Sequence, residues 1–219
     1  MSTLTSGRLR FGSVVLLVSS LLFAAFPLIR PFFPYAPETA EELAQVAAGL
    51  TDPLWVVSHL LAAVALSLLV FVMLTMYALF AGTRSEGKSF VAAILGVTGI
   101  ALLLVVIGAE TFGLSAVAEA YVRGQATDLD ALTKLVRTPV QFALLLPGLI
   151  SLAASAITFV VVNGKERVLA RWGLVVYAIG LTLWLPIMPE MVRLIDGLLI
   201  GVGGVWLSAA CWRLAAART

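Results

Sequence analysis

Long apolar runs separated by short polar segments organise this chain. The stretch from Leu54 to Gly82 is the clearest of them, because it contains no Asp, Glu, Lys or Arg and carries the only histidine, His59. A run of this length can cross the hydrocarbon layer of a bilayer as one helix. Five further apolar runs support the same interpretation, so the pattern predicts an all-α membrane protein with a single domain of six transmembrane helices. The predicted spans cover residues 11–29, 54–82, 90–117, 140–162, 172–187 and 191–214.

Two of the polar segments have the pattern of short amphipathic helices. In residues 39–51, Thr39 and Glu42 have the spacing of a capping box, and apolar residues then recur at helical spacing on one face. Residues 128–136 follow a similar plan, with Asp128 as the expected N-cap before a series of leucines. Both segments are therefore expected to form helices outside the bilayer, on its surface or over the end of the bundle.

The composition supports a membrane protein and excludes several other classes. Hydrophobic residues make up 61% of the 219 residues and charged residues 12%, whereas soluble domains are nearer one half and one quarter. A net charge of +2 is too small to indicate a nucleic-acid partner. The single cysteine, Cys211, excludes an intramolecular disulfide, and the single histidine excludes a bis-histidine haem within the chain. Arg8 and Arg10 precede the first run as in a signal peptide, but that run has the length of a span and no clear cleavage site, so a retained helix is expected.

The distribution of basic residues predicts the orientation. If the N-terminus is cytoplasmic, nine of the 14 basic residues lie in inner segments, and ten of the 12 acidic residues lie outside or toward the outer ends of spans. This agrees with the positive-inside rule, and it predicts that both termini are cytoplasmic in a multi-pass protein of the plasma or inner membrane. The inner basic residues are Arg8, Arg10, Arg84, Lys88, Lys165, Arg167, Arg171, Arg213 and Arg218.

The most distinctive chemical feature is a histidine and a carboxylate at similar depth. With a rise of ~1.5 Å per residue, His59 lies ~8 Å below the outer end of its span, and Glu110 lies ~10 Å below the outer end of the next one. Glu110 shares a helix face with glycines at 96, 99 and 113, which allow another backbone to approach, so its side chain is expected to face protein and not lipid. Intramembrane ionisable residues often have a functional role, although a hydrogen bond that only fixes helix packing is an equal alternative.

Further polar or aromatic residues are expected near the same depth. Together with His59 and Glu110 they predict an outward-facing cluster that binds a ligand or exchanges protons. The additional candidates are Gln141, Trp184, Glu190 and Asp196.

Other motifs are weak or absent. A metal site would need a third ligand beside His59 and Glu110, and no metal-binding spacing supplies one, so none is expected. No phosphate-binding loop or Ser–His–Asp pattern is present. Gly197 and Gly201 have a GxxxG spacing that indicates close helix packing, either inside the bundle or in a homo-oligomer.

Three functions therefore remain open. The first is a protein without an evident catalytic motif that binds a small apolar or amphipathic ligand, or a membrane partner subunit, at the outward-facing cluster. The second is a proton-coupled transporter that uses Glu110 and His59. The third is an outward-facing membrane enzyme or a quinone-binding oxidoreductase subunit, for which the sequence contains no recognisable nucleophile or cofactor motif.

Overall fold

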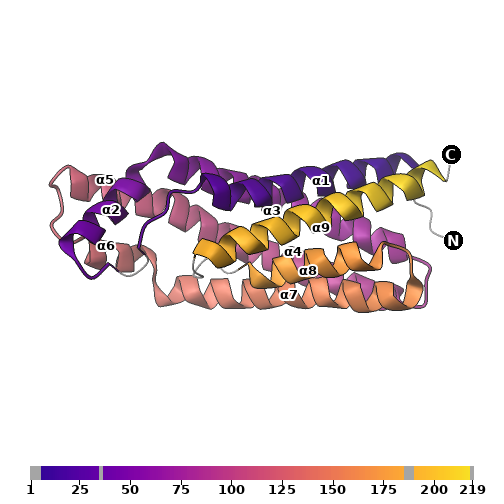
Figure 1. Ribbon diagram of the computed structural model, residues 1–219. Helices are drawn as coiled ribbons and strands as arrows, with labels where there is room; N and C mark the ends of the chain where they lie inside the picture. Colours follow the sequence, from indigo (N-terminus) through magenta and orange to yellow (C-terminus); the bar gives the residue numbers. More distant parts are fainter. Residues whose placement is uncertain (1–5, 35–36, 185–189, 218–219) are drawn as a thin grey trace.

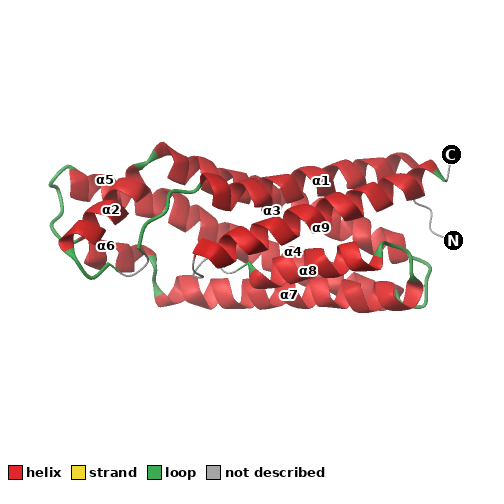
Figure 2. Cartoon of the chain, viewed as in Figure 1, coloured by secondary structure: helices red, strands yellow, loops and turns green. Residues whose placement is uncertain are grey.

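A computed structural model describes residues 6–34, 37–184 and 190–217. These residues form helices joined by short loops, and no strand occurs among them (Figure 2). One turn, η1, is a π-helix that continues α4 into α5 without a break. The elements are α1 (Ser6–Ile29), α2 (Ala40–Thr51), α3 (Pro53–Phe80), α4 (Glu86–Gly108), η1 (Ala109–Leu114), α5 (Ser115–Val122), α6 (Leu129–Val136), α7 (Pro139–Glu166), α8 (Arg171–Leu183) and α9 (Glu190–Ala216).

Five helical stretches are long and apolar enough to cross a membrane. They are α1, α3, the continuous stretch from α4 to α5, α7 and α9. The all-helical class expected from the sequence is confirmed, and the chain is compatible with a multi-pass membrane protein. The expected sixth span, 172–187, is helical only through α8, whose 13 residues reach about 20 Å, less than the ~30 Å of a bilayer core. Residues 185–187 of that range lie outside the described residues.

The helices extend beyond the limits that hydropathy predicted. The first helix begins at Ser6 and not at residue 11, and the third continues to Val122, past the predicted limit of 117. Hydropathy marks the apolar part of a helix, but backbone hydrogen bonding continues into its polar ends. The π-helical turn inside the third helix has no counterpart in the sequence prediction, because apolar periodicity does not distinguish one irregular turn.

The long helices form a closed ring. Going round it, α1 packs against α3, α3 against α4, α4 against α7, α7 against α8, α8 against α9, and α9 against α1. Because neighbours in the ring are also neighbours along the chain, α1 begins and α9 ends at the same end of the bundle (Figure 1). At the opposite end α2, α5 and α6 form a separate layer, here called the cap.

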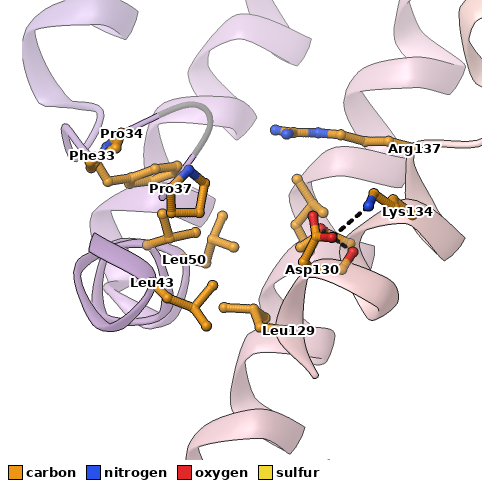
Figure 3. A pocket seen from close by; sticks show the side chains of 12 residues that line it. Phe33, Pro34, Pro37, Leu43, Leu50, Leu129, Asp130, Lys134 and Arg137 are labelled. Carbon is orange, nitrogen blue, oxygen red and sulfur yellow. Dashed lines mark hydrogen bonds and ion pairs between the residues drawn. The ribbon is translucent and has the colours of Figure 1, made fainter. Parts of the chain in front are cut away.

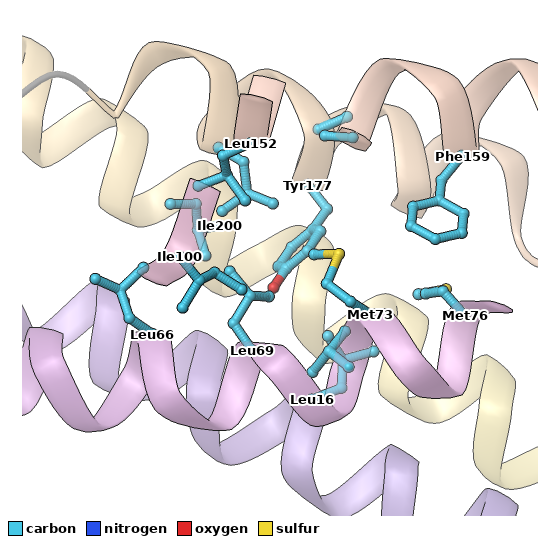
Figure 4. Packing of buried hydrophobic residues seen from close by; sticks show 14 of the residues in the cluster. Leu16, Leu66, Leu69, Met73, Met76, Ile100, Leu152, Phe159, Tyr177 and Ile200 are labelled. Atoms are coloured by element: carbon cyan, nitrogen blue, oxygen red, sulfur yellow. The ribbon is translucent and has the colours of Figure 1, made fainter. Parts of the chain in front are cut away.

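Small residues allow the helices of the ring to pack closely. A Cβ atom added to Gly99 would lie 2.7 Å from the carbonyl oxygen of Gly148 in α7, and one added to Gly203 would lie 2.5 Å from the backbone nitrogen of Tyr177 in α8. The ring is filled by apolar side chains, and Figure 4 shows Tyr177 reaching toward Leu69 and Met73 of α3. Backbones therefore approach at positions where only hydrogen occupies the Cβ site.

Gly197 and Gly201 contact α1 of the same chain. Added Cβ atoms would lie 2.7 Å from Cγ of Pro27 and 3.0 Å from Cβ of Ala24, respectively. The Gly197–Gly201 spacing therefore serves packing between α9 and α1 within the bundle. A homo-oligomer formed through these two glycines stays a prediction.

Two of the cap helices, α2 and α6, are the amphipathic helices that the sequence predicted. Thr39 accepts a hydrogen bond from the backbone N–H of Glu42, whose side chain bonds back to Thr39, so the capping box is confirmed. Asp128 caps α6 by accepting from the backbone N–H of Ala131 at 2.9 Å. A second, smaller apolar core forms between the cap and the ends of the long helices; it contains Val46, Ala47, Leu50, Trp55, Leu114, Ala118 and Leu129.

Candidate functional site

His59 lies on the second turn of α3, at the cap end of the bundle. Asp52 starts this helix by accepting a hydrogen bond from the backbone N–H of Leu54, and Pro53 occupies the first turn, where its missing N–H costs nothing. The imidazole is 2% exposed, and its ring centre lies 4.0 Å from that of Trp55 and 5.3 Å from that of Phe26. Nδ1 lies 2.8 Å from the Trp55 carbonyl oxygen, which can only accept, so Nδ1 carries the proton. A neutral His59 therefore presents Nε2 as an acceptor.

Glu110 lies on the π-helical turn η1. Its side chain is 15% exposed and forms an ion pair with Arg137, with 3.4 Å between Oε1 and Nε. Arg137 follows α6 directly and is itself 23% exposed, so the pair joins the bundle to the cap in a largely buried place. Single π-helical turns are rare and occur frequently at functional sites, where they re-aim a side chain.

His59 and Glu110 line the same small cavity, although no hydrogen bond or ion pair joins them among the described residues. The space open to the centre of a water-sized sphere is about 20 Å³. The sequence argument placed the two groups at equal depth, and the fold brings them to one cavity by packing α3 beside α4 and η1. The lining consists of Phe26, Arg30, His59, Leu103, Val106, Ile107, Glu110, Leu145, Trp184 and Arg193.

The other predicted site residues are divided by the fold. Trp184 lines this cavity, where its ring meets Phe23 edge-on at 5.5 Å. Gln141 and Asp196 are 8% and 1% exposed, but neither lines the cavity, and Gln141 Oε1 and Asp196 Oδ2 have no hydrogen-bond partner within the described part of the chain. Glu190 is exposed at the start of α9. Thus His59, Glu110 and Trp184 line one cavity, whereas Gln141, Asp196 and Glu190 are not part of its lining.

Three arginines that turn toward this region are not among the site residues expected from the sequence, although Arg193 was expected at the same depth as Asp196. Arg30 is 8% exposed, with its guanidinium 4.8 Å from the ring centre of Trp55 and 5.6 Å from that of Phe33. Arg193 lines the cavity from the first turn of α9, and Arg137 pairs with Glu110. All three lie at or just beyond the ends of apolar runs, where arginine usually contacts lipid headgroups and water. That position was the only signal in the sequence, and it indicated orientation, not a site.

A larger cleft opens in the cap, on the other side of Arg137. Its volume, measured in the same way, is about 320 Å³ (Figure 3). One edge carries Lys134, which is ion-paired with Asp130, and this hydrogen bond raises the pKa of the Lys134 ammonium. Figure 3 shows Arg137 reaching toward the space between α6 and the segment that carries Phe33. The lining is otherwise mostly apolar and consists of Phe33, Pro34, Pro37, Leu43, Val46, Leu50, Leu114, Leu129, Asp130, Thr133, Lys134 and Arg137.

Neither a metal-binding group among the described residues nor similarity to a known protein assigns a role to the small cavity or to the cap cleft. The described residues contain no group of three or more His, Cys, Asp or Glu side chains placed to hold a metal ion. No family model, curated protein or solved structure matches this chain. The geometry of the cleft, the cavity and the ion pair between them is therefore the basis for a function.

Proposed function

We propose that the chain crosses the plasma or inner membrane six times, with both termini in the cytoplasm and the cap outside. The support is the shared end of α1 and α9, since an even number of crossings returns the chain to its starting side. In this arrangement α8, which packs between α7 and α9, belongs to the sixth crossing. Arg84, Lys88 and Lys165 lie in or beside the loops at the end opposite the cap, as the positive-inside rule requires of a cytoplasmic face.

Accessibility of single cysteines to a membrane-impermeant thiol reagent tests this orientation. In a C211A background, Q125C on the α5–α6 loop of the cap is expected to react in intact cells. In the same background, K165C at the end of α7 is expected to react only after the membrane is opened. The opposite pattern would invert the orientation, and labelling of both positions in intact cells would refute the six-span arrangement.

We further propose that the cap cleft binds a small amphipathic molecule with an acidic group. The observation that carries this proposal is the juxtaposition, within about 320 Å³, of an apolar lining with the Arg137 guanidinium at one edge. Ligand sites of this size are typically apolar with few polar groups that fix orientation. A guanidinium has five N–H groups, so Arg137 can hold a ligand carboxylate while it keeps its contact with Glu110.

Binding is better supported than transport or catalysis. The charged side chains buried in the described bundle gather beside the cap, whereas the polar groups deeper in the ring are neutral, such as Ser19, Ser155 and Tyr177. A proton or ion path across the bundle would need ionisable or hydrated groups along its whole length. His59 and Glu110 then act behind the cleft, where Glu110 orients Arg137 and His59 supports the cavity wall.

A pair of matched probes tests the proposal. Purified protein is titrated with a fluorescent medium-chain fatty acid and with the corresponding alcohol, which has the same apolar body and no charge. The acid is expected to bind about 10-fold more tightly than the alcohol, because a charge-assisted hydrogen bond contributes about 1.5–3 kcal/mol. The R137Q variant should remove this difference while alcohol binding remains.

A variant that fills the cap cleft provides a second test of the proposed ligand site. Thr133 lines the cleft and is partly exposed, so T133W should fill it and abolish binding of both probes. R123Q is the matched control, since the Arg123 side chain, just after α5, is 66% exposed and forms its ion pair with the exposed Glu119 of α5. Equal binding of acid and alcohol to the unmodified protein, or full binding to T133W, would refute a ligand site in the cap.

A further inference from the structure

The small cavity beneath the cap contains more positive charge than its carboxylate can balance. Arg30, from the end of α1, and Arg193, from the start of α9, both line it. Among the described residues that line it, Glu110 is the one carboxylate, and its side chain is paired with Arg137. Neither Arg30 nor Arg193 has a carboxylate within 4.0 Å among the described residues. Two guanidinium groups thus face one small space without an anionic partner.

The hydrogen-bonding groups of these arginines indicate the same deficit. The Nε atoms of Arg30 and Arg193 are fully buried and find no acceptor within the described residues. Arg30 as a whole is 8% exposed, and its contacts with the faces of Trp55 and Phe33 do not use Nε–H as a hydrogen-bond donor to oxygen. Buried N–H groups are rarely left without a partner, and a buried charge is costly unless an opposite charge lies near.

Asp196 does not resolve this imbalance. It lies one turn after Arg193 on α9 and is 1% exposed, but it does not line the cavity and forms no ion pair within 4.0 Å in the described structure. Counting it nevertheless, the buried region contains three arginines (30, 137 and 193) and two carboxylates (110 and 196). One positive charge remains, which a single monovalent anion would neutralise.

We propose that this cavity binds one small inorganic anion of the halide type, such as chloride, between Arg30 and Arg193. The space open to the centre of a water-sized sphere, about 20 Å³, gives room for one small ion, and a single negative charge balances the excess, whereas the two charges of sulfate would exceed it. Phe26, Trp184 and several aliphatic side chains complete a largely apolar wall, in which an ion is held more strongly than in water. The site is separate from the cap cleft and does not depend on a ligand there.

Thermal unfolding in the presence of different anions tests the site. The full chain is purified into nanodiscs of neutral lipid in sodium gluconate, and sodium chloride or bromide replaces gluconate at constant ionic strength. Because an ion that binds only the folded state stabilises it by mass action, both halides should raise Tm saturably by about 3 °C, and sulfate should not. R193Q should lose this response, whereas R123Q on the cap surface and T133W in the cleft should keep it.

Fluorescence gives a second readout that does not depend on a variant with altered charge. Bromide quenches tryptophan on contact, so occupancy of the cavity should quench part of the emission saturably through Trp184, and chloride should compete. W184F should lose the saturable part. If the unmodified protein shows the same Tm in chloride and gluconate, or if bromide quenches only linearly with concentration, the cavity holds water and the proposal is wrong.

Discussion

The ion pair between Glu110 and Arg137 allows a quantitative test of how the cap is attached to the bundle. The two side chains belong to η1 and to the residue after α6, and they meet at 3.4 Å while 15% and 23% exposed. We consider the isosteric neutral variants E110Q and R137Q and the double variant. Each single change removes one charge and leaves the other in a place where water reaches little of it.

The expected magnitudes follow from the distance and the burial. At 3.4 Å and an effective dielectric constant near 20, the attraction is about 5 kcal/mol, part of which offsets the cost of removing two ions from water. Each single variant should lose about 3 kcal/mol of unfolding free energy, because an uncompensated charge remains buried. The double variant should lose about 4 kcal/mol instead of about 6, which is a coupling energy of about 2 kcal/mol.

Equilibrium unfolding in mixed detergent micelles, followed by tryptophan fluorescence, measures the four free energies of the cycle. The tryptophans report on both layers, because Trp55 belongs to the small core beneath the cap and Trp206 to α9. The exposed pair of Lys134 and Asp130 is the control, since a K134Q/D130N cycle should show no coupling beyond the error of the measurement. Losses for Glu110 and Arg137 that add within about 0.5 kcal/mol would refute the reasoning.

Three further predictions concern packing and capping. G203A should lower the unfolding free energy by about 2 kcal/mol, because the new Cβ meets the backbone of α8 at 2.5 Å, whereas G164A, with nothing within 4 Å, should not. S208A should cost about 1 kcal/mol by removing the hydrogen bond that its hydroxyl donates to the Ser13 carbonyl at 2.9 Å, and a loss below about 0.3 kcal/mol in thermal unfolding would contradict this. T39A should cost about 1 kcal/mol by removing the α2 cap, which faster hydrogen exchange in α2 alone would reveal; unchanged exchange would count against the capping box.

Features that depend on neighbouring residues along the chain could be predicted. Five of the expected spans correspond to long helices, because an apolar run in a bilayer has few alternatives to a helix that satisfies its own backbone. The capping box at Thr39 and the N-cap at Asp128 were recognisable for a similar reason, since each involves atoms only three residues apart. The sixth crossing was also expected from such a run, but α8 is short by itself and its crossing belongs to the proposal.

The depth of a residue along a helix could be predicted from the sequence, but the direction in which its side chain faces could not. Counting residues from each span end placed His59 and Glu110 at one level, and both line one cavity. The same count placed Gln141 and Asp196 nearby, yet these side chains point elsewhere, because the rotation of each helix is decided by how its small residues fit its neighbours. The π-helical turn at Glu110 adds a further local rotation that no periodicity reveals.

The sequence by itself determined the helical class of the protein, the approximate helix limits and the helices α2 and α6 of the cap, since these follow from hydropathy and from hydrogen bonds over a few residues. Only the tertiary structure decided that Arg30 and Arg193 turn inward to line one cavity and that Arg137 pairs with Glu110, which lines the same cavity. An arginine at the end of a span can extend toward water, or it can fold back into protein where partners offset the cost of burying its charge. Which of the two an arginine does depends on aromatic rings and carboxylates from helices distant in the chain. A local sequence pattern does not show these contacts.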